Sequence, residues 1–259
     1  MYSLEKPIVK LMSYFLRIGL FLFLWIISWS YSTAQQLQFF RLDKAHTNIS
    51  NQGSVSDGCI LKDSAGFIWI ASFDGLNRWN GYEMKIYRPD RQDSTSMYAA
   101  DLTTMAIDKN GIMWIGSWSQ GLMRYYPEKE IFDYLLPGPE NHQSPDSRIH
   151  TLRSDAKGQL WVGTGQKGLH RYDFETETFI PYPIARESGN TKVRRSIGGY
   201  KHPIAFLTSK GIFFPELDGG ASGNENFHAL KDVPETIEYG PDGNIWMGYK
   251  DKELSLINI

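Results

Sequence analysis

One polar turn of the sequence carries side chains suited to binding a sugar. Trp118 is followed directly by Ser119 and Gln120. An indole ring stacks on the apolar face of a sugar, while a hydroxyl and an amide hydrogen-bond to its hydroxyl groups. The same tryptophan fits a second interpretation equally well, in which it packs on a neighbouring structural unit. Phe73, in a similar turn, has the same two interpretations.

Other turns of the same kind supply further candidate ligand-binding residues. They are short, polar and bounded by apolar stretches, and binding residues are often carried on such loops above a rigid frame. The candidates are Phe73, Asp74, Trp118, Ser119, Gln120, Gln166, Lys167 and Lys210, with Ser209, Lys250 and Asp251 in equivalent positions.

The remaining reactive side chains form no recognisable catalytic or metal-binding motif. The sequence has no Gly-x-Ser-x-Gly elbow, no phosphate-binding glycine loop and no kinase signature. Six histidines are scattered without metal-ligand spacing, namely His46, His142, His150, His170, His202 and His228. The sequence therefore predicts no catalytic residue, no metal site and no cofactor. The near balance of 27 basic and 29 acidic residues also argues against nucleic-acid binding.

The candidate turns lie inside copies of one repeated segment. Residues 66–79, 111–125 and 158–172 read GFIWIASFDGLNRW, GIMWIGSWSQGLMRY and GQLWVGTGQKGLHRY. Each copy opens with glycine, places a tryptophan after an aliphatic residue and closes with Gly-Leu. An aspartate stands three residues before each opening glycine, at Asp63, Asp108 and Asp155. The pattern predicts an Asp-x-x-Gly turn, a buried strand, a short turn and a second strand.

Two weaker copies extend the repeat along the chain. Residues 243–257 retain Trp246 but carry Gly240 in place of the aspartate, and residues 204–214 carry Ala205 in place of the tryptophan. The five repeats are thus centred on Trp69, Trp114, Trp161, Ala205 and Trp246. A buried tryptophan removes roughly 150–250 Å² from water, worth about 4–6 kcal/mol as an upper bound. Because one hairpin cannot cover that surface, we expect all four tryptophans to form a core between neighbouring repeats.

Further strands complete each repeat. They are predicted before each aspartate turn and after each hairpin, at residues 57–62, 83–87, 101–107, 131–135, 149–154 and 178–182, and in the last repeat at 235–239, 244–249 and 253–258. The connections are predicted at 88–100, 137–148, 183–200 and 215–234. Four antiparallel strands in a repeat of about 45 residues predict an all-β fold, a β-propeller with four-stranded blades.

The two ends of the repeat region are compatible with two arrangements of the ring. Residues 37–42 resemble an outer strand and precede the first repeat, so they would pair with residues 253–258 in a closed five-bladed ring. Alternatively the five repeats are part of a larger ring. We favour the larger ring, of which this chain is an incomplete part, because the repeat at Ala205 lacks its tryptophan.

The N-terminus has the layout of a secretory signal peptide. Basic residues precede the uncharged run 18–29, and small residues follow up to Ala34. We therefore expect residues 1–34 to be a cleaved signal peptide and residues 35–259 to be the propeller. The alternative is an inner-membrane signal anchor at residues 11–31.

Residues 66–88, with the Asp63 turn before them, resemble the two-component regulator propeller repeat, and residues 51–63 resemble the stretch that opens it. Such repeats build the periplasmic sensor region of hybrid two-component histidine kinases of the Bacteroidetes type. The resemblance implies a fragment of a seven-bladed sensor that lacks the kinase and regulator domains. The implied partners are further propeller and kinase domains of the same system.

These observations predict a periplasmic ligand-sensing propeller without catalytic activity. The ligand implied by the resemblance is a glycan or its breakdown product, and a homodimer is a further expectation. Two alternatives are an exported propeller enzyme, of the lyase or quinoprotein type, and an extracytoplasmic protein–protein scaffold.

Overall fold

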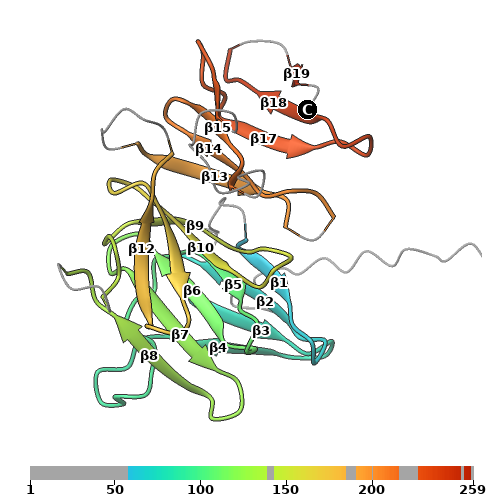
Figure 1. Ribbon diagram of the computed structural model, residues 1–259. Helices are drawn as coiled ribbons and strands as arrows, with labels where there is room; N and C mark the ends of the chain where they lie inside the picture. The colour runs from blue at the N-terminus through green and yellow to red at the C-terminus, as the bar shows by residue number, and fades with distance from the viewer. Residues whose placement is uncertain are drawn as a thin grey trace, which may run out of the picture. The chain divides into compact units, whose positions relative to one another are not determined.

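The computed structural model describes residues 58–138, 143–184, 191–199, 201–215, 227–251 and 254–257. The elements of these ranges are β-strands, each paired antiparallel with its neighbours in the sequence (Figure 1). Among the described residues there is no helix of the length and apolar character needed to span a membrane.

The strands form five consecutive sheets, which we number 1 to 5. Sheet 1 contains β1 (Ile60–Lys62), β2 (Ile68–Ser72), β3 (Gly75–Trp79) and β4 (Met84–Tyr87). Sheet 2 contains β5 (Leu102–Ile107), β6 (Met113–Ser117), β7 (Leu122–Tyr126) and β8 (Ile131–Leu135). Sheet 3 contains β9 (Ile149–Ser154), β10 (Leu160–Thr164), β11 (Leu169–Asp173) and β12 (Thr178–Tyr182).

Sheets 4 and 5 follow the same order of pairing. Sheet 4 contains β13 (Val193–Ile197), β14 (Ala205–Thr208), β15 (Gly211–Phe213) and β16 (Phe227–Ala229). Sheet 5 contains β17 (Thr236–Tyr239), β18 (Ile245–Gly248) and β19 (Ser255–Ile257). Four sheets of four strands, made from successive repeats, confirm the predicted all-β propeller architecture.

Each predicted Asp-x-x-Gly turn forms and also ties down a tryptophan. In sheet 2, Oδ1 of Asp108 accepts hydrogen bonds from the backbone N–H groups of Asn110 (2.8 Å) and Ile112 (3.0 Å). Its Oδ2 accepts a hydrogen bond from the indole Nε1–H of Trp114 at 2.8 Å. Gly111 adopts φ 79°, a backbone conformation that favours glycine. Equivalent indole bonds join Trp69 to Asp63 (2.7 Å) and Trp161 to Asp155 (3.0 Å).

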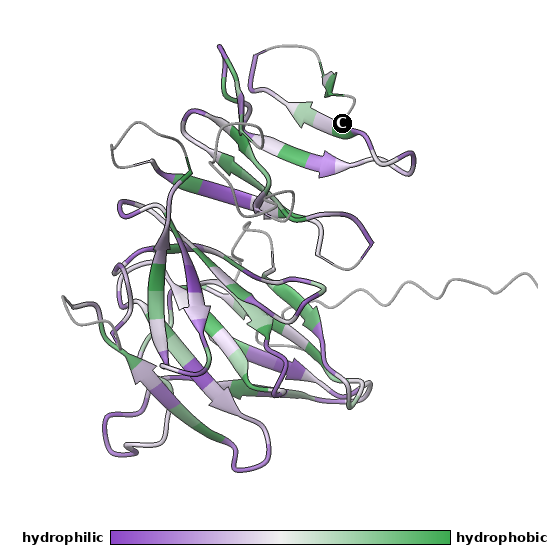
Figure 2. Ribbon diagram, in the orientation of Figure 1, coloured by the Kyte–Doolittle hydropathy of each residue, from purple (hydrophilic) through white to green (hydrophobic). Residues whose placement is uncertain are grey.

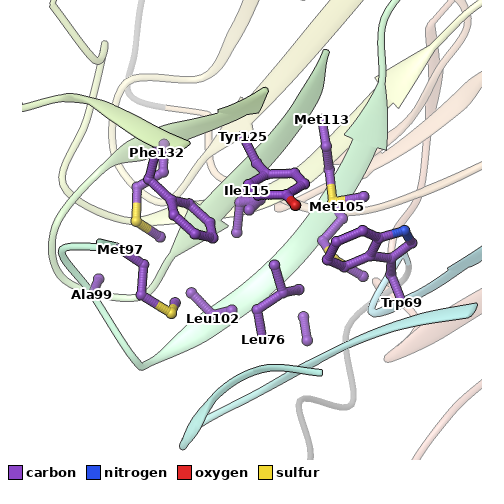
Figure 3. Packing of buried hydrophobic residues seen from close by; sticks show 12 residues of the cluster. Trp69, Leu76, Met97, Ala99, Leu102, Met105, Met113, Ile115, Tyr125 and Phe132 are labelled. Carbon is purple, nitrogen blue, oxygen red and sulfur yellow. The ribbon is translucent and has the colours of Figure 1, made fainter. Parts of the chain in front are cut away.

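Three of the predicted core tryptophans are buried against the next sheet. Trp69 packs on Tyr125 of sheet 2 at 5.2 Å between ring centroids, and Trp114 packs on Tyr172 of sheet 3 at 4.6 Å. Trp161 packs on Phe206 of sheet 4. Figure 3 shows the first of these cores, in which Trp69 and Tyr125 lie among methionine, leucine and isoleucine side chains. The turns between strands are mainly hydrophilic (Figure 2).

The first strands of neighbouring sheets are joined by polar contacts instead. Thr103 Oγ1 donates a hydrogen bond to the carbonyl of Ile149 at 2.6 Å, and the N–H of Leu152 donates to Thr104 Oγ1 at 3.1 Å. Between sheets 3 and 4, Thr151 hydrogen-bonds to Ser196 through their hydroxyls. These side chains are buried away from solvent, where hydrogen bonds are strong. The hydrogen bonds therefore fix the alignment of each sheet on the next.

Trp246 does not belong to the core, contrary to our prediction. Its side chain is 43% exposed. Gly240 replaces the aspartate that holds the other tryptophans, and a Cβ at this position would lie 2.7 Å from Trp246 Nε1. Trp246 is thus held against a backbone turn and lacks the carboxylate that orients the buried indoles.

Two predicted connections contain strands. Strand β13 lies within 183–200, where Arg194 and Arg195 mask the apolar alternation of Val193 and Ile197. Strand β16 lies within 215–234, where Phe227 pairs with Phe213. The predicted strand at 37–42, the signal peptide and the proposed ring closure lie outside the described residues.

Candidate ligand-binding site

The turns between the second and third strands of sheets 1 to 4 share one anchoring contact. In each, a hydroxyl at the end of the second strand donates to the carbonyl of the glycine that closes the turn. The pairs are Ser72 and Gly75 (2.9 Å), Ser117 and Gly121 (3.0 Å), Thr164 and Gly168 (2.9 Å), and Thr208 and Gly211 (2.8 Å). All four hydroxyl residues are buried. This hydrogen bond fixes the backbone at the base of each turn that carries candidate binding residues.

Further backbone bonds hold the turn of sheet 2 to the first strands of sheets 2 and 3. Trp118 N–H donates to the carbonyl of Asp101 at 2.8 Å, and Ser119 Oγ donates to the carboxylate of Asp101 at 2.6 Å. Gly121 N–H donates to the carbonyl of Ser147 at 2.9 Å. The turn that carries Trp118 is therefore hydrogen-bonded at both of its ends, and one of these bonds reaches the neighbouring sheet.

Trp118 lies against two residues of sheet 3 and remains partly open to solvent. The His150 ring stacks on it with centroids 5.6 Å apart and planes 13° apart. The guanidinium carbon of Arg148 lies 4.6 Å from the centroid of the Trp118 ring. Even so, 46% of the Trp118 side chain is exposed. The indole thus packs on the next sheet and still presents apolar surface at the turn.

The turn of sheet 3 joins the same cluster through Asp146. The buried carboxylate of Asp146 accepts hydrogen bonds from the backbone N–H of Gln166 at 2.8 Å and of Arg148 at 3.3 Å. Lys167 stands next to Gln166 and is exposed. Three sequence-predicted residues, Trp118, Gln166 and Lys167, therefore gather around the start of β9.

Two histidines of this cluster are held neutral by their surroundings. Burial, with the nearby Lys167, lowers the pKa of His170 to about 4, despite the opposing effect of Asp146. Burial also lowers the pKa of His150, against the effect of its hydrogen bond to the Val193 carbonyl at 2.8 Å. Because a carbonyl can only accept, Nδ1 of His150 carries the proton of that bond.

The other predicted residues lie apart from this cluster. Phe73 is 40% exposed in the turn of sheet 1, and the neighbouring carboxylate of Asp74 pairs with Arg88 at 2.6 Å. Gln120 lines a separate cleft of about 560 Å³, which also contains Tyr98 and Tyr134. Ser209, Lys210, Lys250 and Asp251 belong to the turns of sheets 4 and 5.

Sequence reasoning missed Asp146, Arg148 and His150 as parts of the site. They precede or begin β9, about 30 residues after Trp118 in the chain. The sequence did contain one indication: the three residues alternate at the start of a predicted strand, and alternate side chains of extended chain lie on the same side. What brings them to Trp118 is the packing of sheet 3 on sheet 2.

The cluster suits binding of a polar ligand with an apolar face. Its contact groups are an exposed indole, a guanidinium, a neutral imidazole and the amide of Gln166. The described residues contain no group of three or more His, Cys, Asp and Glu side chains placed to bind a metal.

The segment that contains this cluster matches a known family model. Residues 143–166, which include Arg148, His150 and Trp161, match the family model described as Two component regulator propeller. The chain carries a two-component regulator propeller repeat. The family resemblance found in the sequence is thus confirmed. Histidine kinase P4 of Formosa agariphila is 45% identical over 47 residues, which make up 18% of this chain and 3% of that protein.

Solved structures with a similar fold include extracellular domains described as parts of two component systems. The extracellular domain of the putative hybrid two component system BT3049 from B. thetaiotaomicron matches with a TM-score of 0.67 and 24% identity, over 85% of this chain and 30% of that one. Virginiamycin B lyase from Staphylococcus aureus matches with a TM-score of 0.52 and 16% identity, over 77% of this chain and 69% of that one. At these identities the likeness establishes the propeller fold. The chain spans less than a third of the sensor domain that it matches.

Proposed function

We propose that this two-component regulator propeller is the ligand-sensing part of a periplasmic sensor and has no catalytic activity of its own. The observation that carries the proposal is Trp118, an indole 46% exposed at a turn that two sheets hold in place. A rigid, half-exposed aromatic ring beside hydrogen-bonding groups provides the contacts that a sugar requires. The family match and the likeness to extracellular sensor domains support a role in signalling.

The proposed ligand is a glycan or its breakdown product. Ser119, Gln166 and Lys167 supply donors and acceptors around the indole, with Gln120 in the adjoining cleft and Phe73, Asp74 and Lys210 on the turns of other sheets. In this proposal residues 1–34 direct the chain to the periplasm. Binding is then communicated to kinase and further propeller domains of the same system.

Titration of the purified chain with glycan fragments, followed by intrinsic tryptophan fluorescence and calorimetry, tests the proposal. We expect a fragment that binds to the parent and loses at least tenfold in affinity with Trp118→Ala, in line with roughly 1–3 kcal/mol for a stacking contact. The matched control is Trp246→Ala, because Trp246 is similarly exposed (43%) but lies in the middle of a strand.

The result that contradicts the proposal is binding that Trp118→Ala leaves unchanged, or the absence of binding by every glycan class. Turnover of a bound fragment, detected by mass spectrometry, would instead favour the alternative of an exported propeller enzyme. Selective capture of another periplasmic protein in place of glycans would favour the scaffold.

A further inference from the structure

The side chain of Arg148 differs from other arginines in the described part of the chain, since no acidic residue there pairs with it. Three other arginines of the chain each pair with a carboxylate: Arg78 with Glu130, Arg88 with Asp74, and Arg124 with Asp133. Among the described residues, no carboxylate forms an ion pair with the Arg148 guanidinium, and its Nε is buried without a hydrogen-bond partner. A buried donor of a charged group that lacks an acceptor is costly. The Nε–H is closed to solvent, so an acceptor from outside the chain would bind the Nη groups, which are not among the buried unpaired atoms.

The position of Arg148 is set by the structure around it. A Cβ on Gly165 would lie 2.8 Å from Cδ of Arg148 and 3.1 Å from its Cγ, so any larger residue would displace this side chain from its present position. Gly165 also donates its N–H to the carbonyl of Arg148 at 3.0 Å. At the far end of the side chain, the guanidinium rests against the Trp118 ring. Arg148 is thus held beside the exposed indole by a complementary surface of sheet 3.

The charges near Arg148 are mainly positive. Lys167 and Lys192 lie close enough to lower the pKa of His170 and of His150 respectively. The two acidic side chains of the cluster already accept hydrogen bonds, Asp146 from two backbone N–H groups and Asp101 from Ser119 Oγ. Positive charge next to exposed apolar surface attracts an anion that also has an apolar face.

His150 supports the same place with its ring rather than with a hydrogen bond to a ligand. Its Nδ1–H is used by the Val193 carbonyl, which leaves Nε2 as the free ring atom. Nε2 is buried and has no hydrogen-bond partner within the described part of the chain. Because Nε2 is closed to solvent, His150 contributes the flat face of its ring, which supports the Trp118 indole from the side of sheet 3.

From these contacts we infer that the ligand of the sensor is an acidic saccharide, whose carboxylate binds Arg148 while its sugar ring packs on the exposed part of Trp118. The inference rests on the proposed function and specifies the chemical class of its ligand. A guanidinium binds a planar carboxylate through two parallel N–H···O bonds, which a neutral sugar cannot offer. Arg148 is accordingly the residue that determines specificity, and Gly165 is the residue that positions it.

The test compares ligands that differ in one group. Oligosaccharides of glucuronic and galacturonic acid are titrated beside those of glucose and galactose, which carry a CH₂OH group in place of the carboxylate. We expect the acidic ligands to bind the parent chain roughly tenfold to a hundredfold more tightly than the neutral ones, the usual range for a charge-assisted bond. We also expect added salt to weaken only the binding of the acidic ligands.

Three variants locate the source of the preference. Arg148→Met keeps an apolar side chain of similar length and removes the charge, so it should abolish the preference. Gly165→Ala forces the Arg148 side chain to move and should reduce the preference several-fold. Lys129→Met removes the same charge from an exposed residue in the turn between β7 and β8, at the other end of β7 from Trp118, and should change nothing. Far-UV circular dichroism and the melting temperature establish that each variant is folded.

The possible outcomes separate the two proposals. If neutral and acidic saccharides bind equally and both depend on Trp118, the proposed function stands and the inference is wrong. If simple acetate or sulfate displaces the ligand at comparable concentration, the cluster recognises a free anion and the inference is also wrong. If no saccharide of either kind binds, the proposed function fails with it. A preference for acidic saccharides that is lost in Arg148→Met supports both.

Discussion

The pairing of Asp108 with Trp114 provides a quantitative test of what holds neighbouring sheets together. Replacing Asp108 with alanine removes the acceptor of three hydrogen bonds, one from the buried indole and two from backbone N–H groups. An unsatisfied buried donor costs about 1–3 kcal/mol, and each backbone bond contributes about 0.5–1.5 kcal/mol. Because water reaches the exposed Asn110 and replaces its bond, the sum is about 3 kcal/mol. For a domain of this size we expect a fall in melting temperature of roughly 6–12 °C.

Urea unfolding of the purified chain measures the effect, and a double-mutant cycle isolates the indole bond. Trp114→Phe removes the N–H but retains an aromatic ring, so Asp108→Ala and Trp114→Phe should be coupled by about 1.5–3 kcal/mol, the range for a bond to a charged group. Trp246→Phe is the matched control, since Gly240 offers no side chain to accept from that indole. We expect this change to cost under about 1 kcal/mol.

The reasoning is refuted if the coupling between Asp108 and Trp114 is below about 0.5 kcal/mol, which is the usual limit of additivity for independent sites. It is also refuted if Trp246→Phe destabilises the chain as much as Trp114→Phe. Either result would mean that packing alone, without the carboxylate, holds the tryptophans between sheets.

Three further predictions concern pH, packing and export. His170 has a pKa of about 4 in the folded chain against 6.5 as its ordinary value, so between these pH values the unfolded chain binds a proton that the folded chain does not. The free energy of unfolding should therefore be highest above about pH 6.5 and fall by up to about 3 kcal/mol as the pH drops to 4. His170→Leu should flatten this dependence in calorimetry at a series of pH values. A Cβ on Gly116 would lie 2.6 Å from Cγ2 of Ile149 in sheet 3, so Gly116→Ala should destabilise by about 1–3 kcal/mol in urea unfolding, and an unchanged midpoint would contradict the close approach of the two sheets. Expressed in a bacterium, the chain should reach the periplasm with an intact mass that starts near Gln35; a full-length species in the membrane fraction would instead indicate the signal anchor.

Much of the fold was predictable because the repeat combines two strong local signals. The Asp-x-x-Gly turns and the tryptophans after aliphatic residues fixed the positions of β2, β6 and β10. Prediction was wrong where one signal was weak or had no partner. The arginines of β13 hide its alternation, and Trp246 has the neighbours of a core residue in sequence but lacks the carboxylate that its equivalents use.

The site was only half predictable for a different reason. Trp118 and Gln166 were found because they occupy equivalent turns of the repeat. Arg148 and His150 were not, because their role depends on how sheet 3 packs on sheet 2 and on the space left by Gly165. A repeat pattern predicts what each sheet contributes, whereas contacts between sheets arise from residues that differ from one repeat to the next.

The two kinds of contact between sheets have an evolutionary consequence. Each of the first three repeats carries a tryptophan for the sheet that follows, and the second also carries apolar residues such as Met113 and Ile115 for the sheet that precedes. A duplicated repeat therefore already carries the two surfaces that contact its neighbours on either side. One recombination event can lengthen the array without further substitutions in the core. The polar contacts of Thr103, Thr104 and Thr151 lie on the first strands, β5 and β9, whereas the binding turns follow the second strands, β6 and β10. New copies can then diverge in their turns, and acquire new ligands, while the alignment of the sheets is inherited.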